Sequence, residues 1–284
     1  MDLTSPRTIR NIQEQFGFTF KKGLGQNFLT ARNILEEIVD AAEIESGVIE
    51  VGPGFGVLTS ELAQNSDKVV TIEIDERLID VLDYTLAEYD NVKIINEDIL
   101  KLDLKKVIDD EFNGEKVSVA ANLPYYITTP IITKLLEEKL PIKNIVVMVQ
   151  KEVAERMSAK PSTKDYGAIT VLCQYYTEPS IVANVPASLF VPPPKVDSAV
   201  LKLKVLDKPS VEVKDEGVFF RVVKAAFSQR RKTLLNCLSA NFPIPKDEIS
   251  TLLESIGIAP SRRGETLSLE EFANIADTLL QKIK

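Results

Sequence analysis

The stretch that decides the fold is Val48-Ile49-Glu50-Val51-Gly52-Pro53-Gly54-Phe55-Gly56. A β-branched run followed at once by closely spaced glycines predicts a strand that turns sharply into a helix. In open α/β sheets this turn is where nucleotides bind, although a tight turn without a ligand is the alternative. The third glycine of the dinucleotide motif is missing, because Val57 stands in its place. Glu50 also suits a cationic ligand better than a pyrophosphate, so a nicotinamide-dependent dehydrogenase is disfavoured.

Further β-branched runs follow this stretch, and helical patterns lie between most of them. We expect strands at 48–51, 69–74, 92–95, 117–120, 145–149, 179–184 and 199–205. Helices are expected at 56–64, 76–88 and 130–138, after an N-terminal helical segment within residues 1–45. Strands and helices that alternate at this spacing predict an α/β fold with a parallel sheet of about seven strands, covered on both faces.

The strand signal stops after residue 206, and the rest of the chain has helical periodicity. Four helices are expected, at 216–227, 232–241, 246–256 and 268–284. The last of them begins with Ser268-Leu269-Glu270-Glu271, the pattern of a capping box. We therefore expect two domains, an α/β domain at 1–206 and a small all-helical domain at 207–284.

The composition excludes several classes of chemistry. The 284 residues contain no histidine, so Ser-His-Asp triads, histidine-ligated zinc and imidazole bases are impossible. Cys173 and Cys237 lie far apart in the sequence, which argues against disulfides and cysteine-rich metal sites. No apolar run has the length of a signal peptide or a membrane span. We therefore expect a cytoplasmic protein with no metal and no membrane partner.

The charge is distributed unevenly along the chain. The formal net charge is −8, yet residues 34–115 hold 22 acidic and 6 basic residues, a net of −16. Residues 1–33 carry 5 basic and 2 acidic residues, a net of +3. Five basic residues and no acidic one lie within 221–232, namely Arg221, Lys224, Arg230, Arg231 and Lys232. A polyanion would meet these local patches, whereas the alternative is that they are solvated helix faces.

Two carboxylates stand at the ends of the second and third expected strands. Glu73 ends the second strand, 21 positions after Gly52, where a carboxylate can accept both hydroxyls of an adenosine ribose. Asp98 follows the third strand and could accept the amino group of an adenine, although a helix N-cap is the alternative. With the glycine turn they form three signals at successive strand ends.

Asn122-Leu123-Pro124-Tyr125 follows the fourth expected strand. The amino group of adenine or cytosine is a poor nucleophile, because its lone pair is delocalised into the ring. The side-chain oxygen of Asn122 and the carbonyl of Leu123, held by Pro124, can accept its hydrogens and turn the lone pair outward. Tyr125 can stack on the base. This tetrapeptide predicts catalysis by positioning, and a turn with a packed tyrosine is the alternative.

Taken together, these motifs resemble those of the S-adenosylmethionine-dependent rRNA adenine N6-methyltransferases, and most closely the KsgA/RsmA type. The resemblance also rests on 25–29 (Gly-Gln-Asn-Phe-Leu), 190–198 (Phe-Val-Pro-Pro-Pro-Lys-Val-Asp-Ser) and 227–232 (Phe-Ser-Gln-Arg-Arg-Lys). It implies a Rossmann-like, seven-stranded class I methyltransferase domain followed by a helical RNA-recognition domain.

The resemblance also implies roles for individual residues. The cofactor-binding residues would be Gln26, Asn27, Leu29, Gly52, Gly54, Glu73, Ile74, Asp98, Ile99 and Asn122. The catalytic residues would be Asn122, Leu123, Pro124, Tyr125 and Phe190, with Phe190 stacking on the flipped adenine opposite Tyr125. RNA phosphates would meet Arg221, Lys224, Arg230, Arg231 and Lys232. Arg262 and Arg263 could add to that set, or could cap helices and form salt bridges within the small domain.

The activity implied is the dimethylation of two adjacent adenosines near the 3′ end of 16S rRNA during small-subunit biogenesis. S-adenosylmethionine is the expected cofactor, the small ribosomal subunit the expected partner, and a monomer the expected state. One alternative is a large-subunit rRNA adenine methyltransferase of the macrolide-resistance type. Another is a nucleic-acid-binding assembly or transcription factor, which would have no use for the Asn122 to Tyr125 motif.

Overall fold

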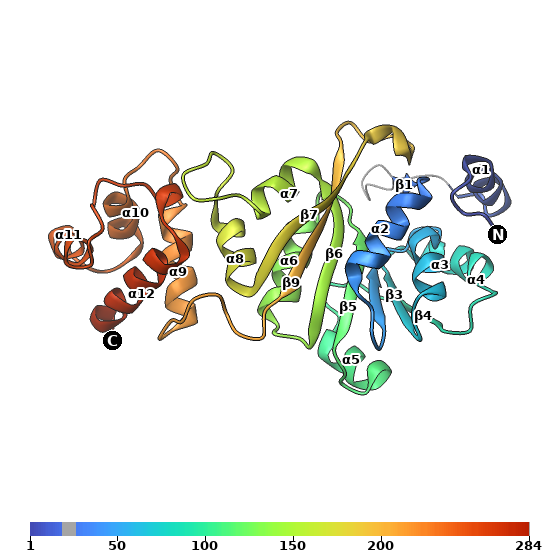
Figure 1. Ribbon diagram of the computed structural model, residues 1–284, viewed down its shortest axis with the longest axis horizontal. Coiled ribbons are helices and arrows are strands. Elements are labelled where there is room, and N and C mark those ends of the chain that lie inside the picture. Colours follow the sequence, from blue (N-terminus) through green and yellow to red (C-terminus); the bar gives the residue numbers. More distant parts are fainter. Residues whose placement is uncertain (19–26, 284) are drawn as a thin grey trace. The chain divides into compact units, whose positions relative to one another are not determined.

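A computed structural model describes residues 1–18 and 27–283 of the chain. Within them, seven strands form one sheet in the order β4-β3-β2-β5-β6-β9-β7, and β1 and β8 form a separate ribbon (Figure 1). The chain divides into two compact units, residues 1–154 with 178–205, and residues 155–177 with 206–284. The second unit therefore includes 155–177, a segment that the sequence analysis assigned to the first domain.

The strands of the large sheet lie where the β-branched runs predict them, within a few residues at each end. They are β2 (Val48–Val51), β3 (Val69–Glu73), β4 (Val92–Asn96), β5 (Val117–Asn122), β6 (Ile142–Gln150), β7 (Thr177–Val185) and β9 (Ser198–Val205). The expected sheet was parallel throughout, and this was wrong for one strand. β9 runs antiparallel to β6, with Ser198 opposite Gln150 and Lys204 opposite Asn144. β2 to β6 are parallel and almost entirely buried except for β4, which explains their continuous apolar runs.

The helices of the first unit surround this sheet. They are α1 (Pro6–Gln15), α2 (Arg32–Ala42), α3 (Val57–Gln64), α4 (Ile79–Thr85), α5 (Leu104–Phe112) and α6 (Thr128–Glu137), with α7 (Lys151–Met157) starting there. α1 starts with Pro6 in its first turn, a position that favours proline. α2 and α3 lie side by side and pack on the sheet through their apolar residues (Figure 1).

The two-residue strands β1 (Phe28–Leu29) and β8 (Phe190–Val191) were not expected from the sequence. They pair antiparallel, with Phe28 opposite Val191 and Leu29 opposite Phe190. The nitrogen of Thr30 extends this pairing by donating to the carbonyl of Leu189 at 2.9 Å. The ribbon therefore joins the N-terminal segment to the loop before β9, which lies far along the sequence.

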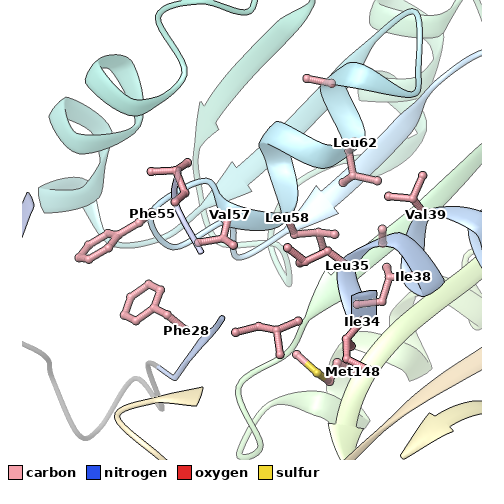
Figure 2. Packing of buried hydrophobic residues seen from close by; sticks show 14 of the residues in the cluster. Phe28, Ile34, Leu35, Ile38, Val39, Phe55, Val57, Leu58, Leu62 and Met148 are labelled. Carbon is pink, nitrogen blue, oxygen red and sulfur yellow. The ribbon is translucent and has the colours of Figure 1, made fainter. Parts of the chain in front are cut away.

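An apolar cluster fills the first unit beside the glycine turn. Figure 2 shows α2 and α3 contributing Leu35, Ile38, Leu58 and other side chains, with Phe28 and Phe55 facing one another. The rings of Phe28 and Phe55 stack with centroids 4.4 Å apart and planes 18° apart. The core therefore fixes the backbone on both sides of the turn.

The second unit is helical, as expected for the C-terminal part. Its helices are α8 (Ala168–Tyr176), α9 (Glu216–Ala226), α10 (Leu234–Asn241), α11 (Lys246–Ser255) and α12 (Leu269–Ile283). α9 packs against α12, α10 and α8. The expected capping box is present, because Glu271 accepts from the nitrogen of Ser268 at 2.9 Å and Ser268 Oγ accepts from the nitrogen of Glu271 at 3.2 Å.

None of the helices in the described ranges has the length and apolar character that crossing a membrane requires.

Candidate active site

The glycine turn opens a cavity at the carboxyl end of β2. Gly52 has φ +71°, and a Cβ built on it would meet nothing within 4 Å, so the space above it is free. Gly54 has φ +60°, and a Cβ there would lie 2.7 Å from the ring of Phe28. Any side chain at Gly54 would therefore displace Phe28 from the wall of the cavity. Both glycines are required by the backbone, and Gly52 leaves room for a ligand to approach.

Two carboxyl groups from neighbouring strands are buried beside this space. Glu50 is 1% exposed, and Glu73 is 6% exposed. The hydroxyl of Thr59 donates to Glu50 at 2.5 Å, and the nitrogen of Asp75 donates to Glu73 at 2.8 Å. Burial raises the pKa of Glu50 to about 8 and the pKa of Glu73 to about 7. Both carboxylates would be stabilised by a ligand that brings positive charge or hydroxyl donors.

Asp98 lies at the next strand end and caps a turn, whereas the N-cap of the following helix α5 is Asp103. Its Oδ1 accepts from the backbone nitrogen of Leu100 at 3.0 Å, as a turn-capping residue does. Its Oδ2 lies 3.7 Å from the ammonium of Lys101, and the residue also lines the cavity. Only one carboxylate oxygen is therefore committed to the local turn.

Asn122 ends β5 with a defined side-chain orientation. Its Nδ2 donates to the carbonyl of Asn27 at 3.1 Å, and the nitrogen of Leu123 donates to the carbonyl of Met148 at 3.1 Å. Among the described residues, neither Asn122 Oδ1 nor the Leu123 carbonyl accepts a hydrogen bond. The two acceptors that the sequence analysis singled out are thus available to an incoming amine.

Tyr125 is half-buried and anchored from another strand. Its Oη lies 2.8 Å from Oγ of Ser198, the first residue of β9, which is fully buried. Burial raises the pKa of Tyr125, so the phenol is neutral at physiological pH. The next residue, Tyr126, has 59% of its surface exposed while it also lines the cavity. Besides Phe28, the cavity is therefore lined by one fixed tyrosine and one exposed tyrosine.

The cavity brings together residues from four strand ends and the N-terminal segment. Of the expected site residues, it is lined by Asn27, Leu29, Gly52, Gly54, Glu73, Ile74, Asp98, Ile99, Asn122, Leu123, Pro124 and Tyr125. Gln26 lies outside the described residues. Sequence reasoning missed Phe28, Ser198 and Tyr126. Phe28 and Ser198 both lie within quoted motifs, but nothing local to Ser198 indicates its contact with Tyr125.

The structure does not place Phe190 on the wall of this cavity, contrary to the expectation that it stacks on the base. Phe190 is 3% exposed and belongs to the apolar cluster. Its backbone pairs with Leu29 in the β1–β8 ribbon, which turns the ring into the core. In this arrangement Tyr125 alone, of the two expected stacking residues, faces the cavity.

The basic residues expected to meet RNA all belong to the second unit, and all five are exposed. Arg221 donates to the carbonyl of Asn241 at 2.9 Å and lies 4.4 Å above the ring centroid of Phe242. Arg230 donates to the carbonyl of Lys164 and lies 3.9 Å from the carboxylate of Glu265. Lys224, Arg231 and Lys232 have no ion-pair partner within the described part of the chain. Two of the five side chains therefore have partners within the protein, and three have no ion pair among the described residues.

Arg262 forms a salt bridge within the small helical domain, which was the alternative to RNA binding. Its guanidinium pairs with both carboxylate oxygens of Glu271 and donates to Thr266 through Nε at 3.1 Å. The hydrogen bonds from Arg262 hold the pKa of Glu271 below its usual value. This arginine joins the start of α12 to the preceding turn rather than presenting its charge to solvent.

Three comparisons with known proteins agree with this geometry. A family model described as ribosomal RNA adenine dimethylase matches residues 17–281. The ribosomal RNA small subunit methyltransferase A of Bacillus mycoides is 55% identical over 285 residues, covering 98% of each chain. Its counterpart from Bacillus anthracis is also 55% identical with the same coverage.

Solved structures agree as well. A dimethyladenosine transferase from Plasmodium falciparum has a TM-score of 0.75 and 29% identity, covering 90% of this chain and 98% of that one. The 23S rRNA methyltransferase ErmE has a TM-score of 0.68 and 27% identity, covering 89% and 100%. With a family model that spans nearly the whole sequence and relatives at 55% identity, this chain belongs to the ribosomal RNA adenine dimethylase family.

Proposed function

We propose that this protein transfers methyl groups from S-adenosylmethionine to N6 of two adjacent adenosines near the 3′ end of 16S rRNA. The product is N6,N6-dimethyladenosine, formed during biogenesis of the small subunit. The observation that carries the proposal is the pair of free acceptors at the end of β5. Asn122 Oδ1 and the Leu123 carbonyl lie in one cavity with carboxylates suited to the cofactor.

The cavity suits S-adenosylmethionine in its shape and its donor set. The open space above Gly52 admits the methionine and ribose part of the cofactor. Glu73 offers carboxylate oxygens to the ribose hydroxyls, and Asp98 has one oxygen available to the adenine amine. Ile74 and Ile99 supply apolar walls for the purine, and 55% of Ile74 is exposed without a ligand. Burial raises the pKa of Glu50 to about 8, and a bound cationic cofactor would favour its ionised form.

The chain's own residues perform catalysis by orientation. When bound, the cofactor supplies a methyl group on a positively charged sulfur. Asn122 Oδ1 and the Leu123 carbonyl accept the two N6 hydrogens, so that the lone pair points at the methyl carbon. Held by Glu73 and Asp98, the cofactor would give its methyl group to N6 and would keep the electron pair of the broken carbon-sulfur bond on its sulfur. Because the chain has no histidine, the amine releases its surplus proton to water.

Tyr125 offers a ring of fixed orientation for the flipped base, since Ser198 holds its phenol. Stacking of one base on an aromatic ring contributes about 1–3 kcal/mol, which offsets part of the cost of extruding the adenine. Pro124 restricts the backbone between the acceptor and the ring. Orientation of amine and base therefore depends on one short segment.

The proposed substrate is the small ribosomal subunit as a particle rather than naked RNA. The net charge of −8 opposes tight binding to an extended polyanion. The named relatives at 55% identity are small-subunit enzymes, which favours this particle over the large subunit. We expect the protein to act in the cytoplasm as a monomer, without a metal.

The experiment that tests the proposal is mass spectrometry of nucleosides after incubation with S-adenosylmethionine. Unmethylated small subunits and large subunits are treated in parallel, with the Asn122→Ala variant as the inactive control. N6,N6-dimethyladenosine from small subunits alone is the expected result. Dimethyladenosine from large subunits would favour the resistance-type enzyme. Methylated adenosine from neither particle would favour the binding-factor alternative.

A further inference from the structure

The loop between α7 and α8, residues 158–167, is fixed against the basic segment 228–232 within the second unit. The backbone nitrogen of Ser162 donates to the carbonyl of Glu265 at 2.7 Å. Nη2 of Arg230 donates to the carbonyl of Lys164. The rings of Tyr166 and Phe227 meet with centroids 5.9 Å apart. Three interactions therefore hold this loop within the second unit, and the hydrogen bond from Arg230 joins it directly to the basic segment.

This loop adds positive charge that the sequence analysis did not consider. Lys160 and Lys164 are both exposed, and within the described residues neither has an ion-pair partner. The single acidic residue of the loop is Asp165, which is half-buried. The loop therefore carries two ammonium groups that have no ion pair among the described residues, and the carbonyl of Lys164 meets Arg230, the residue before Arg231 and Lys232.

Arg230 differs from its two neighbours in the basic segment. Its guanidinium is committed to the Lys164 carbonyl on one side and to the carboxylate of Glu265, 3.9 Å away, on the other. Arg231 and Lys232 are exposed and have no such partner among the described residues. A guanidinium that holds a loop is poorly placed to meet a phosphate as well.

We propose that Lys160 and Lys164 bind phosphates of the RNA backbone together with Arg231 and Lys232, and that Arg230 is the residue that positions this loop. This inference rests on the proposed function, because it takes RNA as the partner. It changes the expected set of RNA-binding residues in two ways. Two lysines from outside 207–284 join the set, and Arg230 becomes a positioning residue.

Lysine suits this role because an ammonium is a compact point charge that meets phosphate without reading sequence. Each phosphate that the protein neutralises releases counterions, so the logarithm of the binding constant falls with the logarithm of salt concentration. The slope becomes shallower by about 0.7–0.9 for each phosphate that is no longer neutralised. The slope therefore reports the number of phosphates bound, which affinity at a single salt concentration does not.

The test measures binding of the full-length protein to unmethylated small subunits between low and moderate salt. The variants are Lys160→Ala/Lys164→Ala, Arg230→Ala, and the triple substitution. Lys208→Ala/Lys246→Ala is the matched control, because both lysines are exposed in the second unit and have no ion-pair partner within the described residues. Circular dichroism and thermal melts check that each variant is folded.

The lysine pair should reduce the slope by about 1.4–1.8, and the control pair should leave it unchanged. Arg230→Ala should reproduce much of the lysine effect, and the triple variant should be no weaker than the double, since both act through the same loop. An unchanged slope in the folded lysine double variant would overturn the proposal that Lys160 and Lys164 bind phosphates. Additive effects of Arg230 and the lysines would show that Arg230 itself meets phosphate, which contradicts its positioning role.

Methylation of the same particles by the wild-type protein separates this inference from the proposed function. A wild-type protein that methylates, with lysine variants of unchanged slope, would refute the surface alone. A wild-type protein that binds with the expected slopes but transfers no methyl group would refute the proposed function and leave the surface supported.

Discussion

The cavity of the first unit and the basic surface of the second unit differ in how firmly their side chains are held. In the cavity, polar groups lie at the ends of buried strands, and each is held by a defined partner, as Asn122 is by Asn27 and Tyr125 by Ser198. On the basic surface, side chains such as Arg231 and Lys232 are exposed on a loop and have no ion pair among the described residues. Single substitutions should therefore be decisive in the cavity, whereas effects on the surface should be small and should sum over residues.

The largest effect is expected at Asn122. Asn122→Ala removes the acceptor for the target amine and the link to Asn27, and methyl transfer should fall by at least about 100-fold. Single-turnover methyl transfer on unmethylated small subunits measures the change. Thermal stability serves as the control and should change little. A variant with wild-type turnover would contradict catalysis by positioning.

The second-largest effect is expected at Glu73 and concerns cofactor affinity. Glu73→Ala removes the carboxylate proposed to accept the ribose hydroxyls, and cofactor affinity should fall by about 10- to 100-fold. Glu97→Ala is the matched control, because Glu97 lines the same cavity but is exposed. Calorimetric titration with S-adenosylmethionine measures both. Equal decreases in the two variants would mean that the burial and position of Glu73 confer no special role.

The buried Glu50 should make stability depend on pH. Burial raises its pKa to about 8, so the unfolded chain releases this proton at lower pH than the folded protein does. Stability from this group is therefore complete below about pH 4.5 and is lost as pH rises towards 8. At pH 9, Glu50→Gln should raise the free energy of unfolding by on the order of 2 kcal/mol and the melting temperature by several degrees. Near pH 5 the substitution should change both quantities little.

Thermal melts of the ligand-free protein and the Glu50→Gln variant across this pH range provide the measurement. A difference between the two proteins that stays constant with pH would show that the carboxyl group does not titrate there.

A smaller effect is expected at Ser198, which does not line the cavity. Ser198→Ala removes the hydrogen bond to Tyr125, and kcat should fall roughly threefold to tenfold with the KM for the cofactor unchanged. Tyr125→Phe removes the same bond from the other side while keeping the ring. The kcat of the double variant should be no lower than that of the less active single variant. Additive effects would mean that the two hydroxyls act independently.

The smallest effects should arise in the second unit. Arg231→Ala/Lys232→Ala should weaken binding to small subunits and reduce the salt slope by about 1.4–1.8, without changing the melting temperature. Arg262→Ala should do the reverse, because its guanidinium pairs with Glu271. We expect its stability to fall by about 1 kcal/mol while the slope stays unchanged. Parallel melts and binding isotherms distinguish the two arginine environments.

Most of the sheet could be predicted from the sequence, because buried parallel strands carry continuous β-branched runs whose limits are easily seen. The direction of β9 could not, since a strand's orientation depends on the connection that precedes it and not on its own residues. The helices α5, α7 and α8 were missed as well. Their apolar residues serve packing that short segments do not reveal, and α8 joins the second unit.

In the candidate site, too, local features could be predicted from the sequence and contacts between distant segments could not. Glycine turns and carboxylates at strand ends are local signals, and the described members of that set line one cavity. The ribbon that pairs Phe28 with Val191, the bond from Tyr125 to Ser198 and the clamp of Arg230 on residue 164 join distant segments. No local pattern encodes such pairings, and this is why Phe190 was expected at the cavity and lies in the core instead.

The most direct test of the central claim is mass spectrometry of RNA fragments from unmethylated small subunits treated with the protein and S-adenosylmethionine. The account predicts one fragment, near the 3′ end of 16S rRNA, in which two adjacent adenosines each carry two methyl groups. A single modified adenosine, modification at another position, or an unmodified fragment would contradict it.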